Sequence, residues 1–326
     1  MSQIFNAVLQ SGCFVPDNDA DQQQPAHSWL AQFSLLRVNG PDSERFLQGQ
    51  LTCNVAELSD NKWSLGACCT AKGRMVANFV IARDSSDGYW LRLPTAQVAA
   101  LIQHLKKYAV FFKTQLTDLS EDYKIVALIP ASQPAQPQLD SEHIISQRTL
   151  NWSEQGAELL YHDGRKELWL SNDQAGDMLT GQTLCDSRRW QLFDINQATI
   201  WVDTDTREHW IPQNIDWHRQ GGVSFSKGCY TGQEIVARLQ YLGKAKKALY
   251  RVNSEQAHPL MTLADIKTAE GRSIGELCSW SDNQGLALLT VTEGLEQVLL
   301  VTESSEIPLS IEKLSYTLEQ ENITDA

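Results

Sequence analysis

Short strand-like runs joined by tight turns, with single helices between them, limit this chain to a small set of folds. Residues 75–82 are apolar on both faces apart from Asn78, and an Asp87-Gly88 turn joins them to the strand-like residues 89–93, as in a hairpin. The apolar residues from 98 to 105 then recur at the spacing of one helix face. Antiparallel hairpins beside isolated helices favour α+β domains over a doubly wound parallel sheet.

Length and composition indicate several folded units. The chain has 326 residues, which at roughly 100–200 residues per domain predicts two or three domains, and its 42% apolar content is enough to form cores. A polar tail is expected over residues 16–28 and a proline-containing linker over residues 131–142. Short β-rich runs after residue 248 indicate a separate all-β module.

The charge balance and the cysteines indicate a cytoplasmic protein. Acidic residues exceed basic ones, giving a net charge of −13, which excludes a dominant basic field for coating nucleic acid or an anionic membrane. No run of about 18 apolar residues predicts a membrane span, and the N-terminus lacks the basic and apolar regions of a secretory signal. Seven irregularly spaced cysteines are typical of reduced thiols, so we expect a cytoplasmic location and no membrane partner.

Familiar nucleotide and metal motifs are absent from the sequence. The chain has no P-loop, no G-x-G-x-x-G, no C-x-x-C and no H-E-x-x-H, so nucleotide hydrolysis, Rossmann cofactor binding and zinc hydrolysis lack sequence support. Cys68 and Cys69 are adjacent, and in a strand their side chains would point to opposite faces. We expect structural burial of this pair and no metal site.

The densest group of chemistry-bearing residues is the sequence GGVSFSKGCYTGQE at 221–234. Cys229 lies between Gly228 and Gly232, which permit close backbone approach or a positive φ, and a helix is expected to start near residue 231 or 232. The free amides of that helix and the ammonium group of Lys227 would stabilise a Cys229 thiolate, able to act as a nucleophile, a soft metal ligand or a redox group. A turn with an inert cysteine explains the same residues equally well.

A basic stretch follows this motif at residues 238–251. Arg238, three lysines and Arg251 supply five positive charges without an intervening acidic residue, and two tyrosines lie among them. Such a stretch on an acidic protein can hold a phosphate backbone or a polyanionic ligand tail, although a solvated surface is the plainer explanation.

The string KGCYTGQE at 227–234 resembles the signature of the YgfZ family of folate-binding proteins. These proteins are relatives of the aminomethyltransferase (T-protein) of the glycine-cleavage system and of mitochondrial iron–sulfur assembly factors. The similarity covers most of the chain. Further matching segments are GPDSERFLQGQLTCNV at 40–55, AKGRM at 71–75, LKKYAVF at 105–111, IPQNIDWHRQGGVSF at 211–225 and GRSIGELCSW at 271–280.

The resemblance implies a T-protein-like α+β fold with three domains around a central channel and a C-terminal β-barrel. It also implies binding of folate, as tetrahydrofolate or a one-carbon derivative, and support of iron–sulfur enzymes such as tRNA-thiolating proteins, and thereby of tRNA modification. The expected organisation is a polar tail at 1–28, a folate-binding α+β domain at 29–120 completed by about 186–240, a second α+β domain at 121–185, the barrel at 245–318 and a tail at 319–326.

The resemblance also assigns roles to single residues. Cys229 maps onto the functionally sensitive cysteine of the family. Trp190 and Phe33 correspond to its two folate-contacting aromatic residues, with Trp29 one helical turn from Phe33. Lys227 or the basic stretch beginning at Arg238 would hold the glutamate tail of the folate, and that stretch would also provide weak contact with tRNA.

Two departures from the family pattern bear on chemistry. T-proteins carry an Asp–Asp pair in the strand after the glycine that matches Gly73, and this chain has Ala77-Asn78 there. Because an amide cannot act as a general base near neutral pH, aminomethyl transfer by that mechanism is not expected. A Glu-Ala-Gly stretch of the relatives reads Asn196-Gln197-Ala198, and the lost carboxylate predicts weaker folate binding or a different ligand.

Three functions are therefore compared. The leading hypothesis is a folate-dependent accessory factor that is not a conventional enzyme. A folate-dependent one-carbon transferase, with Cys229 as the covalent group, is the competing enzyme hypothesis. An RNA- or protein-binding scaffold with an incidental cysteine is the third. The Ala77-Asn78 replacement argues against the transferase, and the acidic net charge argues against the RNA-binding scaffold.

Overall fold

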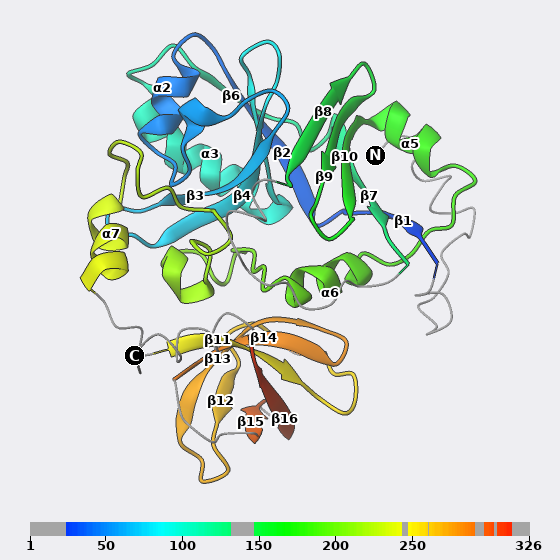
Figure 1. Ribbon diagram of the computed structural model, residues 1–326, viewed down its shortest axis with the longest axis vertical. Helices are drawn as coiled ribbons and strands as arrows, with labels where there is room; N and C mark the ends of the chain where they lie inside the picture. The colour runs from blue at the N-terminus through cyan, green and yellow to red at the C-terminus, as the bar shows by residue number, and fades with distance from the viewer. Residues whose placement is uncertain are drawn as a thin grey trace.

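The computed structural model contains two five-stranded sheets and a closed six-stranded barrel, with helices and loops between them (Figure 1). It describes residues 24–131, 147–242, 247–259, 261–290, 297–302 and 305–314. The 131–142 linker after its first residue, the 319–326 tail and Lys244 and Lys246 of the basic stretch lie outside these ranges.

The first sheet has the strand order β3-β4-β5-β2-β6 and is antiparallel throughout. The predicted hairpin at residues 75–93 is confirmed as β4 and β5, and the predicted helix at residues 98–105 is confirmed as α3 (Thr95–Ala109). The apolar face of α3 packs with α2 (Ser43–Gln48) on one side of the sheet. The strands are β2 (Phe33–Asn39), β3 (Trp63–Cys69), β4 (Met75–Arg83), β5 (Tyr89–Pro94) and β6 (Gln115–Asp118).

The second sheet has the order β1-β7-β10-β9-β8 and carries α5 (Asn172–Leu179) on its outer face. The expectation that residues 26–28 belong to a polar tail is wrong, because they form β1, which pairs with β7 through main-chain bonds that side-chain polarity does not prevent. The strands are β1 (Ala26–Trp29), β7 (Tyr123–Ile129), β8 (Thr149–Ser153), β9 (Gly156–Leu160) and β10 (Lys166–Ser171).

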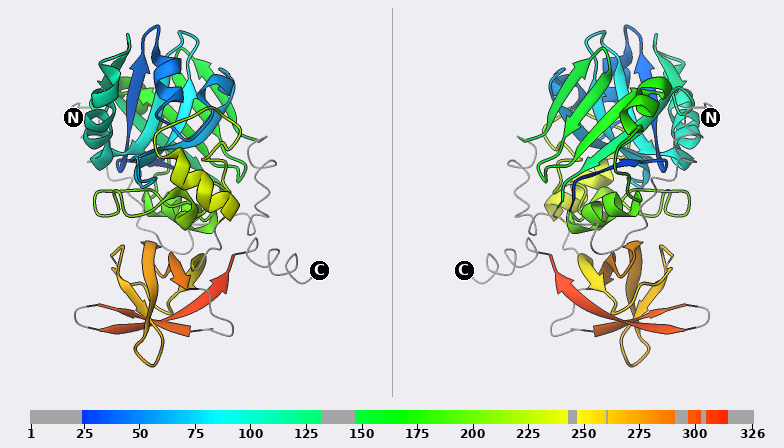
Figure 2. Two further views of the ribbon diagram at one scale, coloured as in Figure 1. Left: turned by 90° about the vertical axis from the view of Figure 1, so that its left-hand side faces the viewer. Right: turned by 90° about the vertical axis from the view of Figure 1, so that its right-hand side faces the viewer.

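The all-β module expected after residue 248 is confirmed as the closed barrel, which Figure 2 shows apart from the two sheets in both side views. Alternating inward residues of its strands form a separate core. The strands are β11 (Lys247–Asn253), β12 (Asp265–Lys267), β13 (Ser273–Ser281), β14 (Gln284–Thr290), β15 (Gln297–Val301) and β16 (Glu306–Lys313).

A layer of short helices and loops lies between the sheets and the barrel (Figure 1). It contains α6 (Arg188–Asn196), a 3₁₀ turn η3 (Pro212–Ile215) and α7 (Gln233–Leu242); a second 3₁₀ turn, η2 (Val55–Glu57), belongs to the first sheet's outer face. The expected helix start near residue 231 or 232 is confirmed by α7. Asn78 of β4 fixes this layer, because its amide donates to the Ile200 carbonyl at 2.8 Å and accepts from the Val202 N–H at 2.8 Å.

Cys68 and Cys69 are fully buried on opposite faces of β3, which confirms the structural prediction for this pair. Cys68 lies in the core under α2 and α3, and Cys69 lies in the core between the two sheets. Burial raises the pKa of the Cys68 thiol to about 12 and raises the pKa of Cys69 as well. Both thiols are therefore inert at neutral pH.

A buried ion pair connects the two sheets. Arg92 of β5 donates from Nε and Nη2 to Glu167 of β10 at 2.9 and 3.0 Å, and neither side chain is exposed to solvent. Tyr161 also donates to Glu167 at 2.7 Å, and Trp169 Nε1 does so at 2.7 Å. The carboxylate thus has partners from both sheets, which is the condition under which a buried charge is tolerated.

Replacing Glu167 by glutamine is expected to lower the free energy of unfolding by about 3 kcal/mol, because it leaves the Arg92 charge buried without its counter-ion. Denaturant unfolding followed by circular dichroism measures this change. Glu158→Gln, which removes the partly exposed partner of Lys166 on the neighbouring strand, serves as the matched control and should cost about 1 kcal/mol or less. Equal losses in the two variants would contradict this assignment.

Candidate functional site

A cavity of about 480 Å³ lies where the first sheet, α6 and the barrel meet. Its volume falls in the roughly 300–1,000 Å³ range of small-molecule sites. Its lining residues are Gln32, Phe33, Pro94, Ser187, Gln191, Asp194, Thr199, Trp201, Asp203, Asp205, Met261, Thr262, Cys278, Ser279 and Trp280.

The aromatic wall of this cavity is built around Arg92. The guanidinium carbon lies 4.2 Å from the centre of the Phe33 ring and 4.3 Å from that of Trp201, so the cation lies against both rings. The two rings meet edge to face at 5.5 Å. Since Arg92 is itself held by Glu167, both rings are fixed before any ligand arrives.

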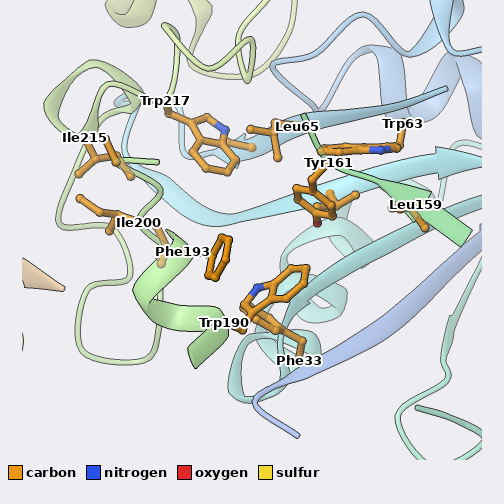
Figure 3. Close-up of a cluster of buried hydrophobic side chains, with 14 of the residues drawn as sticks. Phe33, Trp63, Leu65, Leu159, Tyr161, Trp190, Phe193, Ile200, Ile215 and Trp217 are labelled. Carbon is orange, nitrogen blue, oxygen red and sulfur yellow. The ribbon is translucent and has the colours of Figure 1, made fainter. Parts of the chain in front are cut away.

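Trp190 occupies a different place from the one expected of a cavity wall. It is fully buried on α6 and lies edge-on to Tyr161 at 5.3 Å (Figure 3). The Arg165 guanidinium lies 4.3 Å from the centre of its ring. It is not among the residues that line the 480 Å³ cavity. The aromatic neighbour of Phe33 in the cavity is Trp201, which the sequence reasoning missed because an isolated tryptophan carries no sign of which core or surface it will join.

Trp29 also lies away from the cavity. It is in β1 and packs against the α5 side of the second sheet, so its expected helical spacing from Phe33 is wrong. The strand residues 26–29 and 33–39 are separated by a turn.

The polar part of the cavity is acidic. Asp194, Asp203 and Asp205 line it, and none of its described lining residues is basic. Asp194 accepts from Arg165 Nη1 at 2.6 Å and from Trp201 Nε1 at 2.9 Å. Burial raises the pKa of Asp194, while the Arg165 charge opposes that rise.

A carboxylate lies close to position 196, where the family pattern has a glutamate and this chain has asparagine. Asp194 lies one half-turn earlier on α6 and lines the cavity, whereas the Asn196 carbonyl accepts from Arg251 Nη2 at 3.1 Å on the barrel side. Ala198, at the position of the family's glycine, has a φ of 55°, which explains why glycine suits that position.

Lys227 has a different set of partners from the one expected. Its ammonium donates to the carbonyl oxygens of residues 48, 51 and 53 at 2.8, 2.7 and 2.7 Å. Three donors matched by three acceptors leave no proton for a Cys229 thiolate or a folate carboxylate. Burial lowers the pKa of Lys227 to about 8. Its position shows a structural link between the motif loop and the chain after α2.

Cys229 is exposed at the surface of the loop that leads into α7. Gly232 has the expected positive φ of 87°, and a Cβ there would meet the Thr70 carbonyl and lie 3.1 Å from Gly73 Cα. Gly228 has open space around it and no positive φ, so it does not serve the expected close approach. The loop is thus fixed at its Gly232 end, against the turn between β3 and β4.

The structure does not bring Cys229 together with the cavity residues. No residue of the loop 227–232 lines the 480 Å³ cavity. In Figure 1, α7 lies at one side of the middle layer and α6, which borders the cavity, lies towards the other. The exposed thiol and the cavity are two separate features.

The basic stretch does not form one continuous surface in its described part. Arg238 is exposed on α7 and Lys247 is exposed at the start of β11, whereas Arg251 is buried, with an ion pair to Glu312 at 3.3 Å. None of these three residues lines the cavity.

Across the described ranges, no group of three or more His, Cys, Asp or Glu side chains is placed to hold a metal ion. No helix in those ranges is both long and apolar enough to span a membrane.

Replacing Lys227 by methionine is expected to lower the free energy of unfolding by about 3 kcal/mol, because three carbonyl oxygens lose a charged donor. The rate of Cys229 labelling by a thiol reagent should stay within about twofold of the parent rate, because the ammonium group does not contact the thiol. Lys247→Met, which removes an exposed lysine, is the stability control and should stay within roughly 0.5 kcal/mol. A tenfold slower labelling in native Lys227→Met would contradict this interpretation.

Two family models match the chain. Residues 30–152 match the GCVT N-terminal domain, and residues 246–317 match the C-terminal β-barrel domain of CAF17. The structure resembles the aminomethyltransferase T of the glycine cleavage system from Bartonella henselae, with a TM-score of 0.61, 15% identity, and coverage of 90% of this chain and 87% of that one. The T-protein-like fold expected from the sequence is therefore confirmed.

Full-length relatives are also similar. The tRNA-modifying protein YgfZ of Pectobacterium carotovorum is 31% identical over 320 residues, covering 91% of this chain and 93% of the relative. Those of Sodalis glossinidius and Colwellia psychrerythraea are 30% and 29% identical, covering 89% of this chain and 92% of each relative. With similarity at this level along nearly the whole length of both chains, the protein belongs to the YgfZ family.

Proposed function

We propose that this protein is a folate-binding accessory factor that supports iron–sulfur enzymes and thereby tRNA modification. The relatives named above are tRNA-modifying proteins, and the T-protein-like fold is one that binds folate. The observation that carries the proposal is the cavity of about 480 Å³ with its preorganised Phe33–Arg92–Trp201 wall. Such a wall suits a flat heterocyclic ring.

The acidic lining is suited to bind the pterin ring of tetrahydrofolate and is not suited to bind its glutamate tail. A reduced pterin carries an amino group and ring N–H donors, and Asp194, Asp203 and Asp205 supply acceptors. The carboxylates of the glutamate tail would meet these same acidic residues without a basic partner in the described lining. In this arrangement Phe33 and Trp201 hold the ring, and the tail extends out of the cavity.

Trp190 and Arg238 have less direct roles in this proposal. Trp190 supports α6 from the core side and so positions Asp194, through Arg165, which contacts both. Arg238 and Lys247 are exposed at the surface. There they can make weak contacts with tRNA or with an extended glutamate tail.

Cys229 acts in this proposal as a group presented to a partner protein. Its exposure lets it reach a sulfur atom or a metal of a partner, whereas four of the other described cysteines are buried. Cys53, Cys68, Cys69, Cys229 and Cys278 are free thiols, which agrees with the proposed cytoplasmic location.

The one-carbon transferase alternative has less support. Both polar atoms of Asn78 are used in main-chain bonds that hold residues 200 and 202, so this side chain is a cross-link in place of an acid. A transferase of the T-protein type needs a group that activates the folate nitrogen, and an amide at this position does not supply one.

Tetrahydrofolate is expected to quench the tryptophan fluorescence of the parent protein, with roughly tenfold weaker binding in Trp201→Leu, because one stacking face is lost. Trp190→Phe keeps an aromatic core residue and is the matched control; its affinity should stay close to that of the parent. Circular dichroism verifies that each variant is folded. Absence of saturable quenching in the parent would refute the cavity assignment.

Cells that lack the endogenous family member test the role in tRNA modification. Plasmid-borne parent protein should restore tRNA thiolation, and Cys229→Ala should lose most of that activity, since no other described cysteine is fully exposed. Cys185→Ala, which removes a half-buried cysteine elsewhere, is the control and should restore thiolation. Full restoration by Cys229→Ala would favour the scaffold hypothesis instead.

A further inference from the structure

A second, much smaller cavity of about 30 Å³ lies deeper in the core between the two sheets. Trp63 and Leu65 come from the first sheet, and Tyr161 and Arg148 come from the chain of the second. It shares Asp194, Thr199 and Trp201 with the large cavity.

Arg148 is the unusual member of this lining. It is 3% exposed, and its guanidinium lies 4.7 Å from the centre of the Trp63 ring. Its Nη2 donates to the Gln220 carbonyl at 2.7 Å, but Nε and Nη1 are buried without an acceptor in the part of the chain that the structure describes. A buried donor without a partner is unfavourable, because it has lost its hydrogen bonds to water.

Other buried arginines of the same core are compensated. Arg92 pairs with Glu167, and Arg165 pairs with Asp163 and Asp194. Arg148 makes no ion pair within the described residues, and burial lowers its pKa to about 10. A buried cation is normally retained only with a counter-charge.

The neighbouring polar side chains do not provide that counter-charge. Gln220 is held by its own bonds, from Thr199 Oγ1 at 2.9 Å and to the Ala198 carbonyl at 2.7 Å. Gln197 Oε1 is bonded to His162 Nε2 at 2.9 Å. Asp194, the carboxylate in this lining, is engaged by Arg165 and Trp201. The other polar side chains of this lining therefore already have partners. The charge that remains without a counter-charge is the positive charge of Arg148.

We infer that the small cavity is a binding site for a small planar oxyanion, such as a carboxylate of formate size, held by Arg148. A volume of about 30 Å³ accommodates roughly two to three water-sized groups at about 10–15 Å³ each, which is the size of formate with its three heavy atoms. The anion would supply acceptors for Nε and Nη1 and neutralise the buried charge. This site is separate from the folate cavity and does not depend on the proposed function.

Binding is tested on the full chain with sodium formate and sodium nitrate as probes, against sodium chloride at equal ionic strength. We expect a saturable rise in Tm of about 5 °C at a concentration 100 times the dissociation constant. Arg148→Met should abolish the rise, and Arg188→Met, which removes a half-exposed arginine of α6, should keep it. Line broadening of ¹³C-formate by the parent protein, reversed by nitrate, gives a measurement that does not rely on any variant.

Three outcomes overturn the inference: no saturable effect of formate or nitrate on the parent, an equal effect of chloride, or an effect that persists in folded Arg148→Met. Addition of tetrahydrofolate distinguishes the two cavities. Separate sites give additive increases in Tm, and competition between formate and tetrahydrofolate would overturn the assignment of a separate site.

Discussion

The bidentate pair between Arg92 and Glu167 is the interaction on which the rest of the structure depends. It joins the two sheets, and the same guanidinium fixes the Phe33 and Trp201 rings at the wall of the large cavity. A buried ion pair contributes little net stability compared with apolar residues of the same size. Its value here is geometric, because it sets the distance between two sheets and the orientation of two rings at once.

Local structure could be predicted from the sequence, and the site largely could not. The 75–93 hairpin and the 95–109 helix follow from periodicity and turn residues, which act over a few neighbours. Whether Trp190 or Trp201 faces a cavity depends on how α6 and the following loop pack against both sheets. The same holds for Lys227, whose charge suggested a role at Cys229 but whose acceptors are carbonyls more than 170 residues away.

The chain has the T-protein-like fold, and Asn78 has a structural role in it. Asn78 lies at the position where the resemblance to T-proteins leads one to expect an acid, and its amide fixes the loop that carries Trp201. The cavity and the Cys229 thiol are consequently two separate features of one scaffold. Such an arrangement suits a protein that senses or carries a ligand in one place and meets a partner in another.

The burial of the cysteines has a chemical consequence for the molecule as a whole. Cys53, Cys68, Cys69 and Cys278 are shielded from solvent, and Cys185 is half-shielded. Electrophiles that react with thiols are therefore directed to Cys229 among the described cysteines. The six described thiols thus behave almost as a single accessible sulfhydryl, so that selective modification of Cys229 can report on the state of this part of the molecule.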